Sequence, residues 1–138
     1  MKFSTTDPLN RTVTLKQSTW DYKICNYYNT NSNGEHGNSH PEMEELLETI
    51  KSGIENPQFI FQNTRKIMDG DEEKIVPNDT RQEYIKMYFD KDDFGMRIIK
   101  TIVEFKDDVG DIVTTFKIEK PKKDIKPLGG IIYDSTNK

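Results

Sequence analysis

The segment that best joins reactive side chains to a defined place in the fold is Ser-His-Pro-Glu-Met at residues 39–43. Its serine and glutamate have the spacing of a capping box, and its proline suits the first turn of a helix. Apolar residues then recur at helical spacing, which predicts a helix over residues 41–55. His40 would lie at a helix N-terminus, where unpaired N–H groups favour an anion. A histidine beside a phosphate-sized anion site suits RNA cleavage without a metal.

Such cleavage also needs groups that move protons and groups that hold the charged phosphate. His40 is the predicted proton carrier, because histidine titrates near neutral pH. Lys23 and Arg81 are predicted to hold the phosphate, and Thr114 or Thr115 to supply a hydroxyl contact. Aromatic rings can stack on bases, and cations can hold the RNA backbone. The residues predicted to bind substrate are Tyr84, Lys86, His36 and Lys117.

Each of these residues could instead have an ordinary structural role. His40 precedes a proline and could be an N-cap residue, while the stem of Lys23 could cover an apolar stripe. Thr114 and Thr115 are ordinary strand residues, and His36 lies in a polar loop. The chain has no spacing typical of zinc ligands and no glycine-rich phosphate loop. We therefore expect no metal and no cofactor.

Composition bounds the class of protein. The 138 residues fit a single domain, with a core expected over about residues 12–118 and extensions at 1–10 and 119–138. Net charge is −4, which argues against a large phosphate-binding surface. No run is apolar enough to span a membrane, so we expect no membrane partner. The single cysteine, Cys25, fits a reducing compartment and hence a cytoplasmic site of action.

The pattern along the chain predicts an α+β fold, with two N-terminal helices packed on a four- to five-stranded antiparallel meander sheet. The first helix begins near Trp20, capped by Ser18 or Thr19, and the second ends at Asn56-Pro57. Residues 67–80 are expected to form a charged loop. Residues 131–133 fit either an edge strand or a loose segment. The strands are expected at 12–15, 59–62, 84–89, 96–105 and 112–118.

Strand alternation predicts which side chains share a face of this sheet. The apolar set at Ile85, Met87 and Phe89 is expected to lie under the helices. Tyr84, Lys86 and Tyr88 would then form the opposite, open surface. In the last strand, alternation places Thr114 with the apolar set and Thr115 with Lys117. Either a β-bulge re-aims this strand, or Thr115 supplies the hydroxyl.

Several short motifs follow one another in an order that resembles the barnase–EndoU–colicin–RelE-like ribonuclease superfamily, and in particular its phage and mobile-element branches. The likeness covers about residues 12–118. It implies an endoribonuclease that works without a metal, as a toxin or phage-borne effector. The implied partners are RNA, with tRNA among the candidates, and an immunity or antitoxin protein. The motifs are Thr19–Ile24, His40–Met43, Ile54–Pro57 and Val113–Phe116.

The resemblance also implies roles for single residues. His40 matches the histidine of a His-Pro-Glu motif, and Thr114 matches the threonine of the last strand. Lys23 lies where relatives carry histidine or lysine, with Tyr22 as the alternative alignment. Arg81 and Tyr84 match an Arg/Tyr entry to the meander.

A non-catalytic binding protein on the same scaffold, such as an inhibitor or accessory factor, is the alternative function. The acidic balance of the chain favours it, because such a surface would suit a basic protein partner. A metal-dependent hydrolase is a third hypothesis, and it requires activity to vanish with a chelator.

Overall fold

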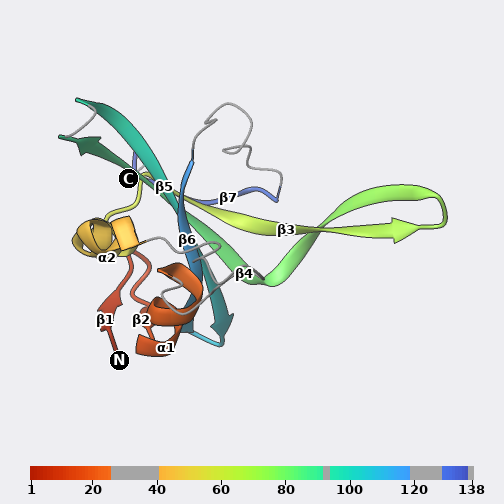
Figure 1. Cartoon of the computed structure of the whole chain (residues 1–138). Helices are drawn as coiled ribbons and strands as arrows, with labels where there is room; N and C mark the ends of the chain where they lie inside the picture. The colour runs from red at the N-terminus through yellow and green to blue at the C-terminus, as the bar shows by residue number, and fades with distance from the viewer. Residues whose placement is uncertain (26–40, 92–93, 119–128, 137–138) are drawn as a thin grey trace, which may run out of the picture.

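The computed structural model describes residues 1–25, 41–91, 94–118 and 129–136 (Figure 1). About 60% of the described residues lie in strands and about 20% in helices. The strands form one curled, seven-stranded sheet in the order β1-β2-β6-β5-β4-β3-β7. They are β1 (Phe3–Thr6), β2 (Thr12–Leu15), β3 (Phe59–Asp69), β4 (Glu72–Asp90), β5 (Gly95–Lys106), β6 (Val109–Ile118) and β7 (Ile131–Asp134).

The helical part of the described chain is short. The first segment is a turn of α-helix, α1 (Gln17–Thr19), that continues as a π-helix, η1 (Trp20–Ile24). The second is a 3-10 helix, η2 (Pro41–Leu46), followed by α2 (Leu47–Glu55). As predicted, α2 ends at Glu55 and Asn56-Pro57 follows it, because the residue before a proline avoids the helical conformation.

The predicted fold class is wrong, because the sheet is larger than expected and mixed. Residues 1–10 were expected to be an extension, but they contain β1, which pairs antiparallel with β2. β2 in turn pairs parallel with β6, from Thr12 opposite Val109 to Thr14 opposite Asp111. β1 is a short edge strand whose only apolar residue, Phe3, is half-buried. Its sequence therefore shows no clear alternation of apolar and polar residues.

The predicted loop at 67–80 is also wrong. β3 and β4 continue there as a paired ribbon, from Thr64 opposite Pro77 to Asp69 opposite Glu72. The ribbon is largely exposed on both faces, so it lacks the apolar alternation by which strands are recognised. The two hairpins that join β4, β5 and β6 are present as predicted, and β7 is an edge strand on β3.

The main core lies between the helices and one face of the sheet. Tyr84 belongs to this core, whereas Ile85 packs with Phe61 and Ile118 on the other face. The prediction for the two faces of β4 is therefore wrong, because the face that carries Tyr84, and not the one that carries Ile85, lies under the helices. The residues of the main core are Val13, Leu15, Trp20, Ile24, Cys25, Met43, Ile50, Ile54, Ile60, Tyr84, Ile99, Val103 and Ile112.

β6 contains a bulge, which is one of the two arrangements that the sequence allowed. Val103 pairs with Ile112, but Ile102 pairs with Thr114, so Val113 is an extra residue. The bulge puts Ile112 and Thr115 on the same face, under the helices. Thr114 is turned to the opposite face.

Candidate functional site on the helix-free face of the sheet

The face of the sheet opposite the main core carries a group of polar side chains. In the part of the chain that the structure describes, the small apolar cluster on this face contains strand residues only, so no helix packs there. The register of the central strands places acidic, basic and hydroxyl side chains side by side at one end of this face. We call these residues the polar cluster: Arg81, Glu83, Lys100, Glu104 and Thr114.

Glu83 and Lys100 form the most enclosed ion pair of the cluster. Lys100 Nζ lies 3.1 Å from Glu83 Oε1, and each side chain is only 13% exposed. The side-chain amide of Asn63 donates a hydrogen bond of 2.7 Å to Glu83 Oε2. Both carboxylate oxygens therefore have a donor, which fixes the orientation of the Glu83 side chain.

Arg81 and Glu104 form a second, more accessible ion pair. Arg81 Nε lies 2.6 Å from Glu104 Oε2, and the Thr80 hydroxyl donates to Glu104 Oε1 at 2.8 Å. The hydrogen bond from Thr80, followed by that from Arg81, lowers the pKa of Glu104 below its usual value. The Arg81 guanidinium has further N–H donors on Nη1 and Nη2 that this ion pair does not use.

Thr114 lies across β5 from Glu83. Ile102 of β5 is paired with Glu83 on one side and with Thr114 on the other, and Lys100 is the diagonal neighbour of both. Adjacent strands are about 5 Å apart, so Glu83 and Thr114 are separated by roughly 10 Å. A carboxylate, an ammonium group and a hydroxyl thus border one small surface. These groups can accept a proton, offset negative charge and donate a hydrogen bond to a phosphate oxygen.

The remaining predicted lysines lie elsewhere. Lys23 is exposed in η1, whose buried residues pack into the main core on the other side of the sheet. Lys86 donates a hydrogen bond of 2.9 Å to the carbonyl of Asn56 and so closes the end of α2. Lys117 is exposed and borders a cleft beside α2. Arg81 and Thr114 therefore share the helix-free face, two strands apart, whereas these lysines do not form part of the polar cluster.

Two further predicted residues are buried under the helices. Thr115 is 4% exposed, and its hydroxyl lies 2.9 Å from that of Thr101. Tyr84 is 1% exposed, so its ring offers no surface on which a base could stack, and the predicted stacking role does not fit the structure. His36 and His40 lie outside the described residues. Along the chain, His40 immediately precedes η2.

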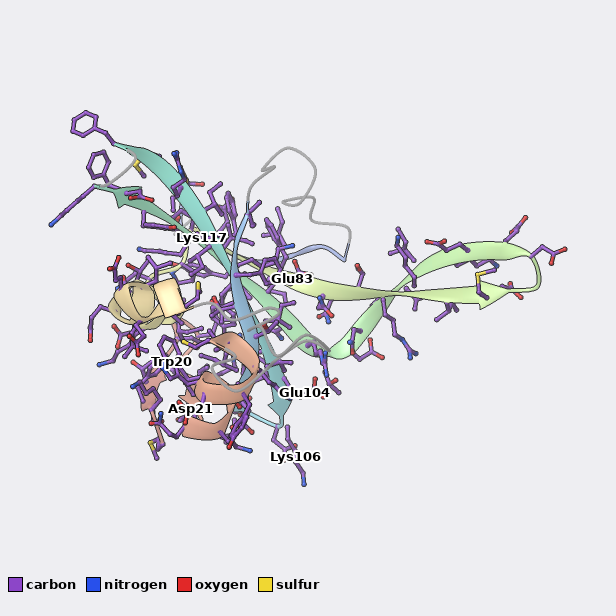
Figure 2. The ribbon with its side chains drawn as sticks, viewed as in Figure 1. Trp20, Asp21, Glu83, Glu104, Lys106 and Lys117 are labelled. Atoms are coloured by element: carbon purple, nitrogen blue, oxygen red, sulfur yellow. The ribbon has the colours of Figure 1, made fainter. Side chains whose placement is uncertain are left out.

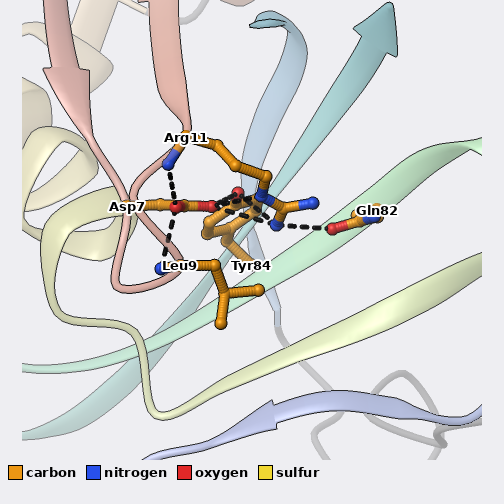
Figure 3. Close-up of polar contacts among 5 residues, drawn as sticks. All are labelled: Asp7, Leu9, Arg11, Gln82 and Tyr84. Carbon is orange, nitrogen blue, oxygen red and sulfur yellow. Dashed lines mark hydrogen bonds and ion pairs between the residues drawn. The ribbon is translucent and has the colours of Figure 1, made fainter. Parts of the chain in front are cut away.

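The Tyr84 hydroxyl belongs to a buried network that fastens the β1–β2 turn to β4 (Figure 3). Asp7 accepts hydrogen bonds from the backbone N–H groups of Leu9 and Arg11 and from the Tyr84 hydroxyl. The Arg11 guanidinium pairs with Asp7 at 2.9 Å and donates to Gln82. Burial, followed by the Asp7 carboxylate, raises the pKa of Tyr84 well above its usual range. All these contacts position the turn, so we assign the network a structural role.

The cleft beside α2 has a volume of about 450 Å³ and a mixed lining. Of the described residues that line it, the two lysines Lys91 and Lys117 are balanced by Glu45 and Asp90. Among the described residues, no group of three or more histidine, cysteine, aspartate or glutamate side chains could hold a metal ion. The described lining of the cleft is therefore not strongly cationic.

Sequence reasoning missed Glu83, Lys100 and Glu104. One signal was present for Lys100, which is the only charge in the otherwise apolar and threonine-containing run of residues 98–103. A second signal was the spacing of Arg81 and Glu83, which puts both on one face of a strand. The pairing of β4 with β5, which brings these residues together, could not be inferred from the sequence. Figure 2 labels Glu83 of β4 and Glu104 of β5.

No helix among the described residues is long and apolar enough to cross a membrane. Comparisons with protein families, with curated proteins and with solved structures found no match to this chain.

Proposed function

We propose that this protein is an endoribonuclease that cleaves RNA without a metal ion. The observation that carries the proposal is the position of Arg81 and Thr114. From the sequence, Arg81 was predicted to hold the phosphate and Thr114 or Thr115 to supply a hydroxyl contact. Arg81 and Thr114 share the helix-free face with the Glu83–Lys100 ion pair. This set of groups matches what attack of a ribose 2′-hydroxyl on the neighbouring phosphate requires.

In the proposed reaction, the 2′-oxygen forms a bond to phosphorus while the bond to the 5′-oxygen breaks. A base takes the proton of the 2′-hydroxyl, and an acid gives a proton to the leaving 5′-oxygen. His40 and Glu83 are the proposed proton carriers. Arg81 and Lys100 offset the extra negative charge of the transition state, and Thr114 donates a hydrogen bond. The products are a 2′,3′-cyclic phosphate and a 5′-hydroxyl end.

The proposal also includes the substrate, the protein partner and the cellular site of this activity. The resemblance to toxin and phage ribonucleases supports a structured RNA such as tRNA as substrate and an immunity or antitoxin protein as partner. The single cysteine, which is buried, supports a cytoplasmic site of action.

Incubation of tRNA with the purified protein in the presence of a chelator tests the proposal. We expect the wild type to produce fragments with 5′-hydroxyl ends. Glu83→Gln should lower kcat/KM about 100-fold as an acid–base defect, and His40→Ala by a similar factor. Arg81→Ala should lower it about 10- to 100-fold, because a charged hydrogen bond to the phosphate is lost.

Glu48→Gln is the matched control for Glu83→Gln, because Glu48 is an exposed glutamate of α2. Its activity should equal that of the wild type. Absence of cleavage by the wild type, or equal activity in all of these variants, would contradict the proposal.

A non-catalytic binding protein is the second candidate, and the other half of the helix-free face favours it. Met87 and Phe89 of β4, Met96 of β5 and Phe116 of β6 are exposed, and the strand register puts them on this face. Adjoining exposed apolar side chains on one face are typical of a protein-binding surface. Induced expression separates the two functions, since a toxic nuclease arrests growth while fragmenting RNA and a binding protein leaves RNA intact.

A further inference from the structure

β3 and β4 extend away from the body of the protein as a two-stranded ribbon (Figure 1). We call its paired part, residues 64–77, the arm. On the body, β7 pairs with β3 only over Phe59–Phe61, and β5 pairs with β4 only from Arg81 onwards. Within the described parts of the chain, both edges of the arm therefore lack a neighbouring strand.

The arm exposes apolar side chains on both of its faces. Ile67 is 38% exposed on one face, and Met68 (65%) and Ile75 (50%) are exposed on the other. A two-stranded ribbon alone in water is marginally stable, and an unpaired strand edge is a template for another strand. The arm thus has the properties of a docking element that is completed by strand addition.

The two edges of the arm differ in their ability to accept a strand. The β4 edge contains Pro77, which has no backbone N–H and so interrupts a ladder of hydrogen bonds. The β3 edge, residues 64–69, contains neither proline nor glycine. Strand addition is therefore expected on the β3 edge.

We propose that β3 of the arm pairs antiparallel with β3 of a second copy of this chain, about a two-fold axis at Ile67. Such an axis stands perpendicular to the ribbon, so each residue pairs with a residue of the partner subunit on the same face. Side chains alternate between the two faces along a strand, so the pairing must be centred on a single residue that lies opposite its own copy. Centring it on Arg65, Lys66 or Asp69 would place a charge opposite its own copy, which is unfavourable.

Only the register centred on Ile67 matches the charges of this edge. It places Ile67 opposite Ile67 of the partner subunit and Arg65 opposite Asp69 of the partner subunit. By symmetry this ion pair forms twice. A register centred on Met68 would instead place Ile67 opposite the partner's Asp69 and Arg65 beyond the end of the partner's β3, so it would form no ion pair within the paired strands. Charge complementarity of the edge with itself therefore selects a second copy as the occupant.

The existing contacts of the arm are compatible with this pairing. Lys74 lies 2.6 Å from Asp69, and Lys66 lies 3.2 Å from Glu73, both across the ribbon. Arg65 is exposed. The dimer would add a second cation beside each Asp69, and the stem of Lys66 would cover Met68 of the partner subunit.

Disulfide trapping of Ile67→Cys tests the register. Opposed residues of an antiparallel pair have Cα atoms about 4.5–5.5 Å apart, within reach of a disulfide. The native Cys25 is fully buried and does not compete. We expect mild oxidation to link Ile67→Cys into a covalent dimer at least about tenfold faster than Ile75→Cys, the matched control on the other strand. Equal rates for the two variants would overturn the proposal.

Charge reversal in the otherwise native chain tests the ion pairs. Arg65→Asp puts like charges together at two symmetric sites, so sedimentation equilibrium should show dimerisation weakened by about tenfold. The double variant Arg65→Asp with Asp69→Arg should restore dimerisation. A wild type that stays monomeric up to about 1 mM, or a double variant that stays weak, would overturn the proposal. Binding of the arm to RNA or to another protein, without pairing to a second copy of this chain, would also overturn the proposal. RNA cleavage is not needed for any of these readouts, so the result does not depend on the proposed function.

Discussion

Tyr84 shows how a polar residue becomes part of a core. Its ring packs with the apolar residues under the helices, and its hydroxyl donates to the buried carboxylate of Asp7 at 2.5 Å. Arg11 donates to both side chains, and its guanidinium lies 4.2 Å from the centre of the Phe105 ring. A tyrosine can be fully enclosed in this way because every polar atom retains a partner.

Tyr84→Phe should lower the free energy of unfolding by about 1–3 kcal/mol, because Asp7 loses a hydrogen bond in a buried site. Urea denaturation at neutral pH measures this loss. The matched control is Tyr133→Phe, which also shortens a tyrosine that packs against the core and is half-buried. It should change stability by less than about 0.5 kcal/mol. Equal effects of both changes would show that the network contributes little.

The raised pKa of Tyr84 also predicts a pH dependence. An unfolded tyrosine loses its proton near pH 10, whereas the folded Tyr84 retains it. The unfolded state then binds fewer protons, so the stability of the protein falls as the pH rises above about 10. Denaturation at several pH values up to about 11 should show a flatter decline for Tyr84→Phe than for the wild type. Parallel curves would contradict the assignment.

At the scale of elements, a strand could be predicted from the sequence only where it buries one of its faces. The strands at 84–89, 96–105 and 112–118 were predictable because each alternates across a buried face. β1 and the arm bury too little apolar surface to leave that pattern. The face of β4 was assigned wrongly because Tyr84 looks polar in sequence, and only its contacts with Asp7 and Arg11 show why it lies inside.

Gly110 of β6 has a structural role that the sequence did not indicate. A Cβ atom at this position would lie 2.6 Å from Val103 Cγ1 and 2.8 Å from the ring of Phe105. Gly110→Ala should therefore lower the free energy of unfolding by about 1–3 kcal/mol through overpacking. Thermal denaturation measures it, with the neighbouring, half-exposed Asp111→Ala as control. A Gly110→Ala variant as stable as the control would show that β5 and β6 can adjust.

At the scale of the whole molecule, pairing between distant segments builds both the sheet and the polar cluster. β2 lies beside β6, and Glu83 meets Lys100 only because β4 and β5 pair in a particular register. Sequence patterns report on neighbours along the chain, so Arg81 and Thr114 could be selected singly but not placed together. The ion pairs of the polar cluster could be identified only from the register in which β4 and β5 pair.

Deletion of residues 1–7 tests the role of the N-terminal segment. It removes β1 and the carboxylate that Arg11 and Tyr84 share, so the free energy of unfolding should fall by more than about 3 kcal/mol. Asp7→Ala in the full chain should account for part of this loss, and the difference reports on the β1–β2 pairing. Urea denaturation measures both. A truncated chain as stable as the wild type would mean that this segment is a dispensable extension after all.

The parallel contact between β2 and β6 also sets the order of events during synthesis. β2 is translated long before β6, so it can pair with β1 at once but with β6 only after residues 109–111 have been made. The opening strands must wait for that late partner, since parallel pairing between distant segments forms slowly. The polar cluster is likewise incomplete until Thr114 of β6 has been translated, so the nuclease activity proposed above would be absent from a nascent chain that has not yet reached β6.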